Sequence, residues 1–122
     1  MSQESFIAID HVQLAMPPGE EQKARAFYEG LLGMTELAKP PELAKRGGCW
    51  FESGSVQLHL GVERDFRPAK KAHPAVRCSN YGVLVRRLRD AGIEATEAHD
   101  IPGVSRCHVY DPFGNRLELI SG

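Results

Sequence analysis

Apolar and polar residues alternate along short stretches of this chain, and two longer stretches carry apolar residues at helical spacing. Alternation over residues 7–16 predicts a strand that ends at Pro17-Pro18-Gly19. Between residues 24 and 32 the apolar positions recur every three or four residues, which predicts a helix that ends at Gly33. Three short strands are predicted to follow, at 35–38, 49–52 and 56–62.

The second half of the chain repeats this order. We expect a strand at 72–78, a helix with Asn80 as its N-cap and Gly92 after its end, and strands at 94–97, 105–110 and 116–120. The repeat predicts an α+β fold of two tandem βαβββ modules, at about 6–62 and 72–120, within a single domain spanning residues 1–122. We expect the strands to form a curved, cup-shaped mixed sheet with the helices outside it.

Composition narrows the class of protein. The 122 residues are 42% hydrophobic and 25% charged, as expected for one soluble globular domain. The formal net charge of −1 provides no field that favours nucleic acid or an anionic membrane. No apolar run approaches the ~20 residues of a membrane span and no signal peptide is evident, so we expect a cytoplasmic protein. Three widely spaced cysteines indicate packed, reduced thiols and argue against disulfides or a cysteine-based zinc site.

Strand alternation separates an apolar face, which should cover the helices, from a polar face. The polar face collects residues that can bind ligands: His11, Gln13, Trp50, Gln57, His59, His73, Arg106, His108, Tyr110 and Glu118. A sheet face that only contacts water is the alternative, but such a face more usually carries Lys, Thr and Ser. Four of the five histidines on one surface with Glu118 favour a cup that holds a ligand.

The candidate metal ligands occupy matched positions in the two halves. His11 and His73 open the halves while His59 and Glu118 close them, at separations of 48 (59 − 11) and 45 (118 − 73) residues. Two imidazoles and a carboxylate around a divalent ion leave positions where two adjacent oxygens of a substrate can bind. We therefore predict a metal site made by His11, His73 and Glu118. Considered one at a time, each of these three side chains could instead be an ordinary hydrogen-bonded or solvated group that binds no metal.

Two further motifs carry a family resemblance. The segments 27–33 (Phe-Tyr-Glu-Gly-Leu-Leu-Gly) and 111–118 (Asp-Pro-Phe-Gly-Asn-Arg-Leu-Glu), with the tandem modules, resemble the vicinal oxygen chelate superfamily over about residues 7–120. That superfamily includes glyoxalase I, extradiol dioxygenases, fosfomycin-modifying transferases and bleomycin-resistance proteins. The resemblance implies a divalent Zn, Ni, Mn or Fe ion with ligands at His11, His73 and Glu118, and at either Gln57 or His59.

Departures from named members leave the reaction open. Glyoxalase I usually has Glu where this chain reads Gln57-Leu58-His59, and fosfomycin transferases and extradiol dioxygenases favour Tyr where it has His108. We expect a metal-dependent lyase, isomerase or dioxygenase that acts on a small oxygen-rich metabolite. The alternative is a metal-free protein that sequesters a small molecule, as bleomycin-resistance proteins do.

The remaining polar residues have predicted roles around the ion. His108 lies ten residues before Glu118 and is a candidate for proton transfer, unless it only shapes the pocket or a metal-bound water is the base. Predicted substrate contacts are Gln13, Trp50, Gln57, Arg106 and Tyr110. We expect a homodimer, because two modules of ~50 residues each would leave apolar strand surface exposed in a monomer.

Overall fold

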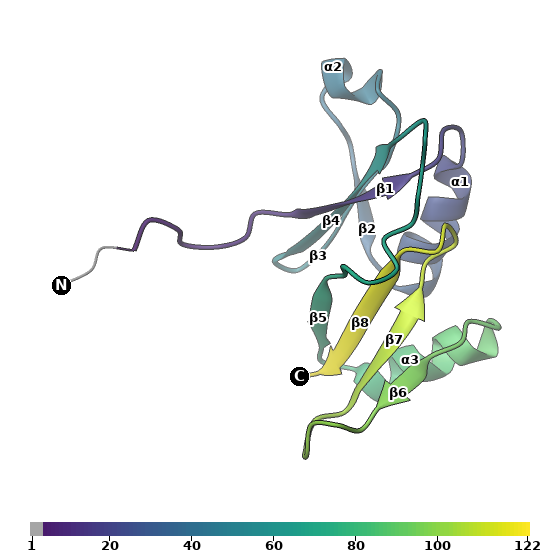
Figure 1. The fold of residues 1–122 in the computed structure, drawn as a ribbon. Coiled ribbons are helices and arrows are strands. Elements are labelled where there is room, and N and C mark those ends of the chain that lie inside the picture. Colours follow the sequence, from purple (N-terminus) through teal and green to yellow (C-terminus); the bar gives the residue numbers. More distant parts are fainter. Residues whose placement is uncertain (1–3) are drawn as a thin grey trace.

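The computed structural model describes residues 4–122, which form two open four-stranded sheets, one from each half of the chain (Figure 1). The first has the strand order β1 (Val12–Met16), β4 (Val56–Val62), β3 (Cys49–Ser53) and β2 (Thr35–Leu37). The second has the order β5 (Ala75–Cys78), β8 (Arg116–Ser121), β7 (Arg106–Tyr110) and β6 (Thr96–Ala98). In both sheets the first strand of the half pairs in parallel with its last strand, and the other pairs are antiparallel. The predicted pair of βαβββ modules is confirmed.

The helices lie where the spacing of apolar residues predicts them, but they differ from the prediction in some details. The first is a short α-helix, α1 (Glu21–Ala24), that continues as a seven-residue π-helix, η1 (Arg25–Leu31). The second module has the longer α3 (Tyr81–Asp90). Asn80 is the N-cap residue of α3, as predicted, but its side chain makes no capping hydrogen bond. An unpredicted helical turn, α2 (Pro41–Ala44), begins at a proline, whose fixed φ suits the first helical position.

Several strands are shorter than predicted. β1 begins at Val12, not at residue 7, because its ladder with β4 starts at the Val12–Leu58 pair and β4 itself begins only two residues earlier. β5 begins at Ala75, where its pairing with Glu118 starts. Residues 4–11 therefore precede the sheet as an arm that extends away from the modules (Figure 1). Within the described part of the chain, no helix is long and apolar enough to cross a membrane.

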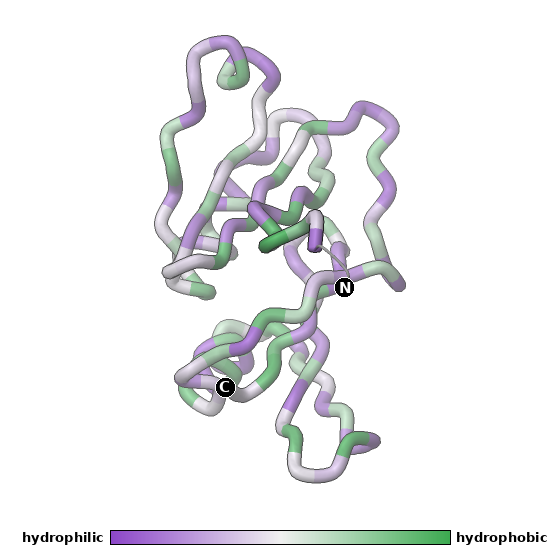
Figure 2. Tube along the Cα trace, turned by 90° about the vertical axis from the view of Figure 1, so that its left-hand side faces the viewer, coloured by the Kyte–Doolittle hydropathy of each residue, from purple (hydrophilic) through white to green (hydrophobic). Residues whose placement is uncertain are grey.

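The core lies between each sheet and its helix, as the alternation predicts. Leu58 and Leu60 of β4 are buried, as are Leu117 and Leu119 of β8. On the helices the buried side chains include Phe27, Tyr28, Leu84, Val85 and Leu88. Hydrophobic and hydrophilic residues accordingly alternate along the chain trace of both modules (Figure 2). The three cysteines are unpaired and buried, as predicted.

The hairpin between β7 and β8 joins the two modules. The buried Asn115 donates from Nδ2 to the carbonyl oxygen of Ala15 at 2.7 Å and accepts from the backbone N–H of Ala69 at 3.0 Å. Asp111 accepts a hydrogen bond from Tyr28, which lies in η1 of the first module. These bonds satisfy buried polar groups of both halves, so the hairpin fixes where β1 lies relative to the second sheet.

Candidate functional site

Three ligand-bearing side chains meet on the polar side of the second sheet. His108 of β7 and Glu118 of β8 are directly opposite in the ladder, and His73 lies two residues before Ala75, the β5 partner of Glu118. Glu118 Oε1 is 2.9 Å from His73 Nε2 and 3.5 Å from His108 Nε2. One ion bound at 2.0–2.2 Å would hold neighbouring ligand atoms about 3–3.5 Å apart, so these separations suit a shared metal.

The hydrogen bonds of His73 support the same conclusion. Its Nδ1 lies 2.7 Å from the carbonyl oxygen of Lys71, while its Nε2 faces Glu118 Oε1. Because a carbonyl only accepts, Nδ1 must carry a proton. Nε2, the nitrogen that faces Glu118 Oε1, is then the one available to a metal ion. A backbone carbonyl on the far nitrogen is also the usual arrangement for a metal-bound histidine.

Arg106 fixes the other side of the carboxylate. Its Nη1 donates to Glu118 Oε2 at 2.9 Å and its Nη2 donates to Asp100 at 2.6 Å, so Oε1 is left to the two histidines. The hydrogen bond from His73, with that from Arg106, lowers the pKa of Glu118. Burial lowers the pKa of His108. An ionised carboxylate and a neutral imidazole are the protonation states that metal binding requires.

A second group lies on the first sheet. The ring of His59 stacks between His11, with centroids 4.1 Å apart, and Trp50, with centroids 4.5 Å apart. Gln57 accompanies them, since its Oε1 is 3.1 Å from His59 Nε2. Burial, followed by the neighbouring His11, lowers the pKa of His59. These rings border a groove that Gln13 also lines, and because His11 and Trp50 cover both faces of His59, that ring offers a ligand only its edge.

The structure therefore divides the predicted site into two groups. Among residues 4–122, the His, Cys, Asp and Glu side chains with mutual spacing for a metal are His73, His108 and Glu118, within 4.8 Å of one another. His11 and His59 lie outside that group, so one chain does not assemble the predicted triad of His11, His73 and Glu118. The metal position itself stays a prediction. Gln13 lines a further groove together with His73, which places it between the two groups.

Two predicted substrate contacts have different surroundings from those expected. Both terminal nitrogens of Arg106 are already paired, one with a candidate metal ligand. Tyr110 is 46% exposed at the end of β7, opposite Arg116. Sequence reasoning missed Asp100, because it lies in the loop before β7, where strand alternation gives no information about side-chain direction.

Comparison with known proteins agrees with the fold. The family model described as the glyoxalase/bleomycin resistance protein/dioxygenase superfamily matches residues 8–119. A solved structure from Bacillus anthracis, described as a glyoxalase family protein, is 47% identical with a TM-score of 0.95 and covers 99% of each chain. Glyoxylase I 4 of Arabidopsis thaliana is 25% identical over 92% of this chain and 69% of its own.

A more distant structure shows the same fold in a protein with a different description. TnmS3, an antibiotic-binding protein from Streptomyces sp. CB03234, is 22% identical with a TM-score of 0.70 over 95% of this chain and 98% of its own. The predicted resemblance is confirmed by the family match over nearly the whole chain. This protein belongs to the glyoxalase/bleomycin resistance protein/dioxygenase superfamily.

Proposed function

We propose that this protein is a metal-dependent enzyme that acts on a small oxygen-rich metabolite, as a lyase, isomerase or dioxygenase. The observation that carries the proposal is the meeting of His73, His108 and Glu118 with their ligand atoms within 4.8 Å. A divalent ion bound there, such as Zn, Ni, Mn or Fe, would stabilise negative charge on two adjacent substrate oxygens. In this proposal, His73 and Glu118 are ligands whichever residue is the third, because their side chains face each other across the position of the ion.

The chain's own groups prepare this position in two ways. The backbone carbonyl of Lys71 accepts a hydrogen bond from Nδ1 of His73, and Arg106 donates one to Oε2 of Glu118. Each ligand is therefore left with one atom, Nε2 of His73 or Oε1 of Glu118, to face the ion. Substrate would contact Trp50 and the edge of His59 in the groove that they border, with Gln13 and Gln57 as hydrogen-bonding partners. Tyr110 and Arg106 remain predicted contacts at the margin of the site.

The third ligand has two candidates. His108 completes the set within one chain, and we favour it on the observed distances. The sequence pattern instead names His11, with His59 nearby and His108 free for proton transfer. That arrangement requires His11 to come from a second copy in the proposed homodimer. The two ligand sets predict opposite results: His108→Gln loses the metal in the first and keeps it, with a slower chemical step, in the second.

Metal content tests the proposal directly. The protein purified without added ions should contain about one divalent ion per chain by elemental analysis, and Glu118→Gln or His73→Ala should lose it. His99→Ala is the matched control, because His99 is an exposed histidine of the same module that faces Glu97. Equal metal in the wild type and in both site variants would refute the proposal. Mixing His11→Ala with Glu118→Ala protomers tests a shared site, since only a shared site regains one intact ligand set.

The second candidate function is metal-free binding of a small molecule in the cytoplasm. The groove bordered by His11, His59 and Trp50 favours it, because a small molecule can contact these rings there without any need of an ion. A screen by thermal shift separates the two functions: ligands that stabilise the protein equally with and without a chelator would indicate a binder. Ligands that require the metal would support the enzyme.

A further inference from the structure

The arm at residues 4–11 exposes large apolar side chains. Phe6, Ile7 and Ile9 are 92%, 97% and 79% exposed, and the arm extends away from both modules (Figure 1). Single exposed apolar residues are common, but three within four positions form a patch of the kind that usually contacts another surface. The same segment carries the carboxylates of Glu4 and Asp10 and has neither Lys nor Arg.

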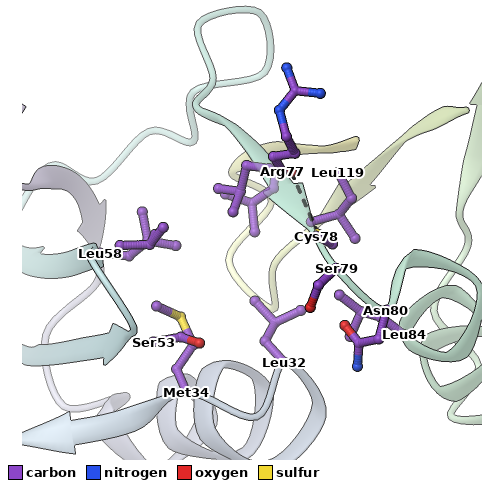
Figure 3. A pocket seen from close by; sticks show the side chains of 13 residues that line it. Leu32, Met34, Ser53, Leu58, Arg77, Cys78, Ser79, Asn80, Leu84 and Leu119 are labelled. Atoms are coloured by element: carbon purple, nitrogen blue, oxygen red, sulfur yellow. Dashed lines mark hydrogen bonds between the residues drawn. The ribbon is translucent and has the colours of Figure 1, made fainter. Parts of the chain in front are cut away.

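An apolar groove lies between the two modules, on the face of β8 opposite Glu118. Leu58 and Met34 of the first module face Cys78 and Leu119 of the second across a cavity of about 170 Å³ (Figure 3). Because Leu119 alternates with Glu118 along the strand, this groove is separate from the candidate metal site. Its lining combines aliphatic side chains with the polar residues Ser53, Arg77, Ser79 and Asn80.

The only cation lining this groove, among the described residues, is Arg77. Its Nη1 lies 3.4 Å from the carbonyl oxygen of Ser121, a weak hydrogen bond, and it forms no ion pair within residues 4–122. In Figure 3 its guanidinium points away from the cavity floor. The groove thus has an apolar floor and a positive rim, while the arm has apolar side chains and negative carboxylates.

We propose that the arm of one chain lies in the inter-module groove of a second copy. Alternation of an extended chain puts Ile7 and Ile9 on one side, toward the apolar lining of the groove. It leaves the carboxylate of Glu4 for Arg77, because the carboxylate of Asp10 already lies 2.9 Å from His11 Nδ1. A second copy is the occupant because the arm leaves its own body instead of lying over its own groove. Two chains exchanging arms form a closed pair. This contact rests on the proposed homodimer and not on the metal site.

A double variant that introduces charges into the arm tests the contact. Ile7→Asp/Ile9→Asp changes only solvent-exposed side chains, so each chain should fold normally, and the dimer dissociation constant by sedimentation should rise at least about tenfold. Val83→Asp is the matched control, because Val83 is a 62% exposed apolar residue on α3. It should leave the dissociation constant unchanged. An unchanged constant in the arm variant would overturn the proposal while leaving the dimer intact.

The native thiol of Cys78 offers a second test, since it lines the groove. Ile7→Cys protein, oxidised with copper–phenanthroline, should give a disulfide-linked dimer on a non-reducing gel, and Ile7→Cys/Cys78→Ser should not. A disulfide formed within single chains would place the arm in its own groove and overturn the exchange. A monomeric wild type at micromolar concentration would overturn both the arm contact and the homodimer. With His108 as the third ligand, metal content measured in parallel should be equal in all these variants.

Discussion

Tyr28 donates a 2.7 Å hydrogen bond from its hydroxyl to Asp111 Oδ2, although 83 residues separate the two along the chain. Both side chains are buried. Asp111 Oδ1 also accepts the backbone N–H groups of Phe113 and Asn115, so the protein replaces much of the water that would solvate this carboxylate. The bond joins the two motifs that carried the family resemblance, one in the first helix and one in the last hairpin.

Removing the Tyr28 hydroxyl should therefore weaken the contact between modules. Tyr28→Phe leaves Asp111 without one buried donor, which typically costs about 1–3 kcal/mol of unfolding free energy. Urea unfolding followed by circular dichroism measures the change. Tyr110→Phe provides the control, because Tyr110 is substantially exposed and should lose less than ~0.5 kcal/mol. Equal losses of unfolding free energy in the two variants would show that the buried hydrogen bond stabilises the protein no more than the exposed hydroxyl does.

The same phenol should make stability depend on alkaline pH. Burial, and then the charge of Asp111, raise the pKa of Tyr28 well above its ordinary value of 10.0. Above that ordinary value the unfolded chain loses the proton while the folded chain keeps it, so stability should fall as pH rises, by at most about 1.4 kcal/mol per pH unit. The difference in urea midpoint between pH 8 and 10.5 should be smaller for Tyr28→Phe than for the wild type.

The sequence predicted the two modules well because both signals are local. Alternation identified the buried face of β4 and β8, and helical spacing identified η1 and α3. The strand at residues 7–16 was drawn too long, because the arm has the same alternation as β1 but no partner beyond the start of β4. Alternation reports which face a side chain would take; it does not report whether a neighbouring strand exists to pair with.

The sequence predicted the candidate residues as one group, whereas the structure brings His73, His108 and Glu118 together and stacks His11 on His59 apart from them. Which of these residues bind a metal stays a prediction. Strand parity placed His11 with His73 and Glu118, since all three lie on polar faces. Parity, however, acts within one sheet, and the two modules form separate sheets whose relative placement depends on the distant contacts of Asp111 and Asn115. The direct opposition of His108 and Glu118 was predictable in principle, because both lie on one hairpin.

The stack of Trp50 on His59 should report the protonation of that histidine. Trp50 is the chain's single tryptophan, and a charged imidazolium in contact with an indole quenches its fluorescence. Burial lowers the pKa of His59 from its ordinary 6.5, so the quenching midpoint on acidification should lie below pH 6.5. His59→Gln should abolish that transition, whereas His99→Gln should preserve it. A midpoint above 6.5 would show that the ring is not held neutral by burial.

Arg106 should affect metal binding in two opposing ways. Its positive charge repels a divalent ion, but its hydrogen bond to Glu118 Oε2 holds the ligand oxygen Oε1 toward the two histidines. Groups that orient a metal ligand typically contribute 10–100-fold in affinity. We therefore expect Arg106→Gln to weaken metal binding by about 10–100-fold, measured by competition with a chelating dye.

Asp100→Asn separates the two effects. Asp100 holds Arg106 from the solvent side, and its side chain is 71% exposed, so this variant loosens Arg106 without removing its charge. If orientation dominates, Asp100→Asn should weaken metal binding slightly and in the same direction as Arg106→Gln. If repulsion dominates, Arg106→Gln should instead bind the ion more tightly than the wild type. The second result would mean that the ion must displace Arg106 from Glu118 before it can use both carboxylate oxygens.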